Sequence, residues 1–155
     1  MRAAAPRDVP GIIALIRELA IYEREPDAVV NTESMLREAL FGPSPGVHAH
    51  VVDRGGEVVG AAVWFLNYST WTGRNGIYLE DLIVRESDRG RGYGLGLVRE
   101  LARICVDRGY TRFEWSVLDW NEPSIRFYRS IGAKPMDEWT LQRLEGTALR
   151  ALAVG

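Results

Sequence analysis

One stretch constrains the fold of this chain more than any other: an apolar strand that runs into a glycine-rich turn and then into an amphipathic helix. The strand ends at Val84, and the turn carries the pattern Arg89-x-x-Gly92-x-Gly94. Glycine lets the backbone approach a ligand closely, and the first turn of a helix leaves N–H groups without intrahelical partners. The pattern therefore indicates a strand–helix junction that could bind phosphate. A glycine-rich turn without a ligand is the alternative.

The spacing of the glycines excludes the two commonest nucleotide fingerprints. A dinucleotide site needs G-x-G-x-x-G, but leucine follows at the third glycine position in both possible registers, at Leu95 and Leu97. A P-loop needs lysine followed by serine or threonine, and this turn contains no lysine. Arg89 and Arg91 supply the positive charge instead. The turn is thus suited to a phosphate-bearing ligand of another kind.

Hydrophobic periodicity predicts one mixed α/β domain over residues 1–155. We expect three central strands in an antiparallel meander, and a strand after the crossover helix that lies parallel to the third of them. The predicted elements are an edge strand at 2–5, a helix from Asp8 to Tyr22, a helix capped by Asn31 or Thr32, strands at 47–53, 58–68 and 77–84, a helix to Arg108, a strand at 112–118, a helix at 124–131 capped by Asn121, a strand at 139–144, and a helical turn or tail at 147–153.

Composition excludes several classes of protein. The chain is 46% hydrophobic and 26% charged, and no apolar run approaches the ~20 residues that span a bilayer, so we expect a cytoplasmic protein without a membrane association. A net charge of -2 argues against nucleic acid as a partner and is compatible with cationic substrates. Cys105 is the only cysteine and lies in a helical apolar pattern, so we expect a buried thiol and no covalent enzyme intermediate.

Six separated motifs in the chain resemble the GNAT superfamily of N-acetyltransferases, and are most similar to its diamine branch, which includes spermidine/spermine and thialysine acetyltransferases. The resemblance implies the GNAT fold, an α/β arrangement whose mixed, mostly antiparallel sheet has a central splayed parallel strand pair and flanking helices. It also implies acetyl-CoA as cosubstrate, no metal, and a homodimer. The motifs are Leu15-Ile16-Arg17-Glu18-Leu19-Ala20-x-Tyr22-Glu23, Tyr68-Ser69-Thr70-Trp71, Tyr78-Leu79-Glu80-Asp81, Arg89-Gly90-x-Gly92-x-Gly94, Asp119-Trp120-Asn121-Glu122-Pro123-Ser124 and Phe127-Tyr128-x-x-x-Gly132-Ala133.

On the cosubstrate side, the resemblance implies that strand residues 82–84 pair with the pantetheine amides as an added strand would. A backbone N–H near Leu82 is the candidate donor to the oxyanion, a role worth roughly 3 kcal/mol. Asn121 is equally well explained as a helix cap without any ligand. The residues expected to bind the cosubstrate are Leu82, Ile83, Val84, Arg89, Gly90, Arg91, Gly92, Tyr93, Gly94, Leu95, Asn121, Ser124 and Tyr128.

On the acceptor side, the resemblance implies that Glu80 is the general base, acting through a water, and that Tyr128 is the general acid toward the CoA thiolate. A base is needed because an alkylamine with a pKa of roughly 10 is protonated at neutral pH. Adjacent strand residues point to opposite faces, so Glu80 and Asp81 can enter one pocket only through a bulge. The residues expected to line the acceptor pocket are Tyr22, Glu23, Trp71, Glu80 and Asp81.

Each of these roles has a simpler alternative. Glu80 could be a solvated strand carboxylate, Tyr128 a core aromatic residue, and Trp71 a packed loop anchor.

The expected function is transfer of acetyl from acetyl-CoA directly to a primary amine of a small cationic acceptor. Polyamine-acetylating members of the branch carry an aspartate where this chain has Ser69. A short diamine, thialysine or another lysine-like amine is therefore favoured over a long polyamine. Three alternatives remain. The first is a GNAT enzyme that acts on an antibiotic, an amino acid or a peptide N-terminus. The second is a catalytically silent acyl-CoA-binding module, and the third is a non-enzymatic interaction domain.

Overall fold

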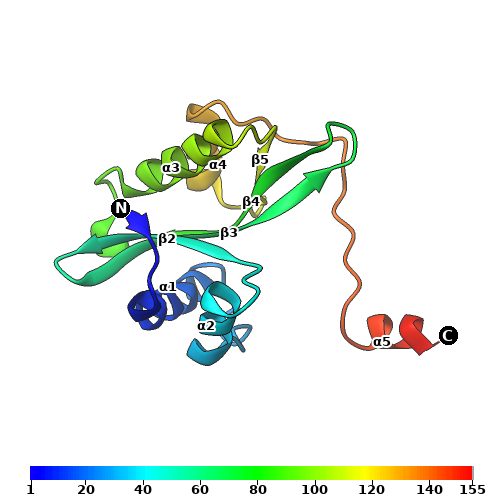
Figure 1. Cartoon of the computed structure of the whole chain (residues 1–155), viewed down its shortest axis with the longest axis horizontal. Helices are drawn as coiled ribbons and strands as arrows, with labels where there is room; N and C mark the ends of the chain where they lie inside the picture. The colour runs from blue at the N-terminus through cyan, green and yellow to red at the C-terminus, as the bar shows by residue number, and fades with distance from the viewer. Residues whose placement is uncertain (155) are drawn as a thin grey trace. The chain divides into compact units, whose positions relative to one another are not determined.

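A five-stranded sheet in the order β1-β2-β3-β4-β5 is the framework of the computed structural model, which describes residues 1–154 (Figure 1). Neighbouring strands from β1 to β4 are antiparallel, and β4 and β5 are parallel. The antiparallel meander and the parallel crossover predicted from the sequence are both confirmed. The strands are β1 (Arg2–Ala3), β2 (His48–Arg54), β3 (Glu57–Ser69), β4 (Arg74–Val84) and β5 (Phe113–Glu114).

The chain divides into two compact units, Met1–Ser116 and the segment from Val117 onward, and each is described by itself. The first unit holds the whole sheet, with α1 (Val9–Tyr22) and α2 (Glu33–Phe41) on one face and α3 (Tyr93–Asp107) on the other (Figure 1).

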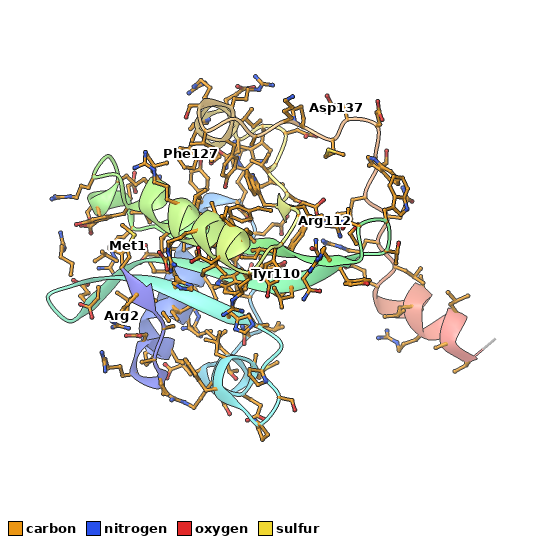
Figure 2. The ribbon with its side chains drawn as sticks, turned by 45° about the horizontal axis from the view of Figure 1, so that its top comes forward. Met1, Arg2, Tyr110, Arg112, Phe127 and Asp137 are labelled. Carbon is orange, nitrogen blue, oxygen red and sulfur yellow. The ribbon has the colours of Figure 1, made fainter. Side chains whose placement is uncertain are left out.

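Each face of the sheet has its own apolar core, because side chains along a strand alternate between faces. Ala61 and Val63 of β3 pack with the residues of α1 and α2, whereas Ala62 and Trp64 pack with Leu97, Leu101 and Cys105 of α3. Met1 also lies against α3, where its side chain fills the space beside Gly96 (Figure 2). The sheet is thus fixed between two helical layers.

The N-terminus of α1 is tied to the sheet by Asp8, which is buried although it is charged. Its carboxylate accepts hydrogen bonds from Arg2 at 2.5 and 2.9 Å and from the Ala5 N–H at 2.7 Å. Arg2 also pairs with Asp53 of β2 at 2.8 Å. The arginine lowers the pKa of the Asp8 carboxyl. Asp8 occupies the predicted N-cap position, but it makes no side-chain cap to the helix and instead joins β1, β2 and α1.

The C-terminus of α1 turns through Arg24, whose φ of 69° is in the left-handed region. The Glu25 N–H donates to the Ala20 carbonyl at 2.9 Å, and the Arg24 N–H donates to the Ile21 carbonyl at 3.1 Å. This pair of bonds is a Schellman motif, in which the left-handed position is usually glycine. Of the two caps considered for α2, Thr32 is the one formed: its hydroxyl accepts from the Met35 N–H at 3.2 Å.

The second unit contains α4 (Glu122–Ser130) and α5 (Gly146–Val154). The predicted Asn121 cap is confirmed, because its side-chain oxygen accepts from the Ser124 N–H at 3.3 Å.

Two strand predictions were wrong in extent or in kind. The expected strand at 112–118 is reduced to β5, and residues 139–144 form no strand. Trp139 and Leu141 do alternate with polar residues, but both are exposed. A strand is stable only when it is paired in a sheet, and within residues 1–154 this segment is paired with no strand.

Within residues 1–154 no helix is long and apolar enough to cross a bilayer, and no group of three or more His, Cys, Asp or Glu side chains is placed to hold a metal ion.

Replacing Arg24 by glycine should raise the free energy of unfolding by about 0.5–1 kcal/mol, because glycine adopts the left-handed conformation without steric cost. Urea unfolding of the two proteins measures the difference. A loss of stability would show that contacts of the Arg24 side chain outweigh its backbone strain.

Candidate active site

A β-bulge at Glu80 is the feature from which the site is built. Val63 of β3 is opposite Asp81, and the next residue, Trp64, is opposite Leu79, so Glu80 is an extra residue on β4. The bulge reverses the faces of β4: Leu79 packs in the α3 core, whereas Ile83 packs in the α1 core. With a regular alternation, residues 79 and 83 would share one face. Glu80 and Asp81 could enter one pocket only through a bulge, and the structure has a bulge at Glu80.

Asp81 is turned by the bulge toward the face covered by α1, where the charges of Glu23 and Glu80 act on its carboxyl group. Burial and the nearby Glu80 and Glu23 carboxylates raise the pKa of Asp81 to about 6. Burial also raises the pKa of Glu23, the C-cap residue of α1. Glu23 and Asp81 are half-buried, whereas Glu80 is exposed. A partly buried carboxylate near other negative charges favours either a bound proton or a bound cation. The cluster of Glu23, Glu80 and Asp81 is therefore suited to an ammonium group.

The edge of β4 that faces β5 is open beside this cluster. β5 pairs only with Ile77 and Tyr78, although β4 continues to Val84. Within residues 1–154 no strand pairs with residues 79–84 along that edge. Exposed strand backbone accepts an extended ligand as an additional strand. The predicted splayed pair is thus present, and the pairing of residues 82–84 with a pantetheine-like chain stays a prediction.

The glycine turn begins where that open edge ends. Gly90 and Gly92 have φ values of 76° and 78°, and Gly92 is the N-cap of α3. A methyl group added at either glycine would meet no atom within 4 Å, so backbone conformation, and not crowding, requires glycine at both. At Gly94 an added methyl group would meet only the Val84 side chain, at 4.0 Å. The turn is open at a helix N-terminus, which is a position suited to a phosphate group.

Asp88 stabilises the glycine turn through ion pairs, a role that the sequence did not indicate. Its side chain is completely buried. It forms an ion pair with Arg54 at 2.6 Å, which lacks the geometry of a hydrogen bond, and a second, longer ion pair with Arg91 at 3.8 Å. Ser87 donates a hydrogen bond to it at 3.2 Å. Arg91, expected at the cosubstrate, is therefore held partly by Asp88. Charged residues are common before such turns, so no sequence signal marks this one as buried.

Arg89 joins the turn to two other elements. Its Nε–H donates to the Val84 carbonyl at 3.2 Å, and its guanidinium carbon is 5.1 Å from the centroid of the Tyr22 ring.

Two other predicted cosubstrate residues are on the first turn of α3. Tyr93 packs against the α3 core and Leu95 is half-buried, so the side chain of Tyr93 has a packing role.

Trp71 is not brought together with the other acceptor residues. It lies at the tip of the β3–β4 hairpin, where its side chain is 90% exposed. Glu80 lies six positions after Arg74 on β4, a distance of about 20 Å along an extended strand. Trp71 therefore does not line a pocket with Glu80 in the same chain, and it is not a packed loop anchor.

Three predicted site residues lie in the second unit. Asn121 is buried as the cap of α4, Ser124 supplies the capped N–H, and Tyr128 is on the same helix with its ring centroid 5.2 Å from that of Phe127. Their participation in the site stays a prediction.

Comparison with known proteins identifies the family. Residues 14–133 match the model of the acetyltransferase (GNAT) family. The chain is 38% identical to a thialysine N-epsilon-acetyltransferase of Sus scrofa, with 99% of this chain and 96% of that protein covered. It is 33% identical to an L-ornithine N5-acetyltransferase of Arabidopsis thaliana, with 98% and 86% covered.

A solved structure agrees with the sequence relatives. An integron cassette protein from V. cholerae superposes with a TM-score of 0.84 at 27% identity, covering 99% of this chain and 96% of that one. The chain belongs to the GNAT acetyltransferase family, and its relatives place it in the diamine branch. It is an N-acetyltransferase of a family whose cosubstrate is acetyl-CoA.

Replacing Asp81 by asparagine should stabilise the protein at pH 7 by about 1–3 kcal/mol. A carboxyl whose folded pKa is about 6 binds a proton more readily in the folded state than in the unfolded state. The contribution of Asp81 to the free energy of unfolding is therefore intact below about pH 4 and is lost as the pH rises through 6. Urea unfolding between pH 4 and 8 should show this decline in the parent protein and a flatter profile in the variant.

Asp27→Asn, at an exposed turn, is the matched control and should change neither the stability nor the slope. If the free energy of unfolding of the Asp81→Asn variant declined with pH as much as that of the parent protein, the decline would not be due to the Asp81 carboxyl.

Proposed function

We propose that this protein transfers acetyl from acetyl-CoA directly to a primary amine of a small cationic acceptor, either a short diamine or a lysine-like amine such as thialysine. The observation that carries the proposal is the cluster of Glu23, Glu80 and Asp81 beside the open edge of β4. The names of the relatives, thialysine and L-ornithine acetyltransferases, support an acceptor with two charged ends.

The size of the acceptor is argued from Ser69, where polyamine-acetylating members carry an aspartate. Ser69 is buried, and its hydroxyl accepts a hydrogen bond from the Thr72 N–H at 3.3 Å. It therefore stabilises the hairpin turn and adds no charge for a distant ammonium group. A short acceptor that is bound by the three carboxylates alone suits this arrangement, and a long polyamine is the less favoured acceptor.

Acetyl-CoA supplies the acetyl group as an activated thioester. The backbone of residues 82–84 would orient the pantetheine arm, and the N–H groups of the glycine turn would hold the phosphates. An N–H near Leu82 would donate to the carbonyl oxygen of the reacting group.

Proton transfer is assigned to three side chains. Glu80 would accept the proton of the acceptor ammonium through a water, and Asp81, with its raised pKa, would hold the charged end of the acceptor or share that proton. Tyr128 would donate a proton to the departing sulfur.

The broader organisation is also proposed. One N-acetyltransferase domain is supported by the family match, since residues 14–133 cross the boundary between the two units. A homodimer would give Trp71 a role, because the exposed tip of the β3–β4 hairpin could then complete the acceptor pocket of the partner. A cytoplasmic location is the compartment we propose for a chain with one cysteine.

Replacing Gly94 by alanine should weaken acetyl-CoA binding at least tenfold without destabilising the protein. The free protein has room for the methyl group, and alanine is the better helix former by about 1 kcal/mol. Calorimetric titration with CoA and thermal unfolding measure the two effects. Equal CoA affinity in the variant would show that the ligand does not approach this turn.

The acceptor is tested by CoA release with thialysine, lysine, short diamines, polyamines, aminoglycosides and peptides. We expect the highest kcat/KM with thialysine or a short diamine. Tyr128→Phe should lower kcat by ~10²-fold with little change in acetyl-CoA affinity, and Glu80→Gln should also lower it.

Turnover of peptides alone would contradict the small-amine proposal. Binding of acetyl-CoA without turnover of any amine, unaffected by either substitution, would favour a silent acyl-CoA-binding module.

A further inference from the structure

Arg89, in the glycine turn, contacts two other elements of the first unit: the end of α1 and the end of β4. Its Nε–H holds the Val84 carbonyl at 3.2 Å, and its guanidinium lies over the Tyr22 ring, 5.1 Å from the centroid. Val84 ends the open edge of β4, and Tyr22 precedes Glu23, a member of the carboxylate cluster. The arginine thus spans from the cosubstrate side of the site to the acceptor side.

The Tyr22 ring restricts a side chain that would otherwise be mobile. Arg89 is exposed, and an exposed arginine samples many rotamers. A guanidinium over an aromatic face is held by cation–π attraction, and the Nε–H bond to Val84 fixes the plane of the fork. The terminal nitrogens of the guanidinium carry four further N–H donors, which are suited to a phosphate oxygen.

We propose that Tyr22 is a positioning residue that couples the two halves of the site through Arg89. An anion bound at the turn immobilises the guanidinium, and the guanidinium in turn orders the Tyr22 ring and the end of α1. That end carries the Glu23 carboxylate and turns at Arg24 in its left-handed conformation. A bound cosubstrate therefore prepares the acceptor side, and a bound amine strengthens cosubstrate binding by the same factor. This inference rests on the proposed function of the same site.

The expected coupling follows from the strength of the contact. A partly exposed cation–π pair is worth about two- to fivefold in an equilibrium constant. The affinity of thialysine should rise by about that factor when CoA, which carries the pyrophosphate but no acetyl group, is bound. No turnover is involved, so the coupling is read from binding alone.

The experiment is calorimetric titration of thialysine with and without saturating CoA. In Tyr22→Leu the coupling factor should fall to about one, whereas Tyr22→Phe should retain it, since phenylalanine keeps the aromatic face. Arg89→Lys keeps the charge but loses the planar fork, and it should lose the coupling as Tyr22→Leu does. Ile21→Ala, an exposed neighbour on α1, is the matched control and should behave as the parent protein. Thermal unfolding verifies that each variant is folded.

Three results would overturn the inference, and they separate it from the proposed function. If the parent protein binds CoA and thialysine without coupling, or if Tyr22→Leu retains the full factor, the coupling role fails and the proposed function stands. If the parent protein binds no CoA, both fail.

Discussion

The bulge at Glu80 is the constraint on which the rest of the site depends. A regular β4 would turn Asp81 and Ile83 toward α3, and the α1 core would lose a buried isoleucine. By adding one residue, the strand keeps Leu79 in one core and Ile83 in the other. Asp81 is thereby placed near Glu23 and Glu80, where burial and charge repulsion raise its pKa to about 6. The same local irregularity thus satisfies packing and creates a site for a cation.

The charges of the first unit are separated along β4. Carboxylates gather at the bulge, and the glycine turn beyond Val84 presents helix N–H groups with Arg89 beside them. Buried Asp88 holds Arg54 and Arg91 beneath this turn, so its positive charge is fixed by the fold. In the proposed function, an anionic cosubstrate at the glycine turn and a cationic acceptor at the bulge would meet the same open strand edge. This arrangement is the physical basis for assigning transfer between them to this chain.

The parts of the site that follow from local chain chemistry were predictable from the sequence. Gly90 and Gly92 adopt positive φ at a strand–helix junction, and Asn121 caps its helix, because these properties depend on a few adjacent residues. The features that depend on distant contacts were not predictable. Alternation at residues 139–144 resembles a strand, but within the described residues this segment is not paired in a sheet. The motif around Trp71 implied a pocket residue, yet strand length puts it about 20 Å from Glu80. The burial of Asp88 requires the tertiary fold to be known.

The most direct test of this account is the titration of the Asp81 carboxyl carbon by NMR, first in the free protein and then with thialysine and CoA bound. The account predicts a pKa of about 6 in the free protein, which falls when the ammonium group enters the cluster, because a neighbouring cation favours the charged carboxylate. A pKa near the ordinary aspartate value of about 4, unchanged by the amine, would contradict it.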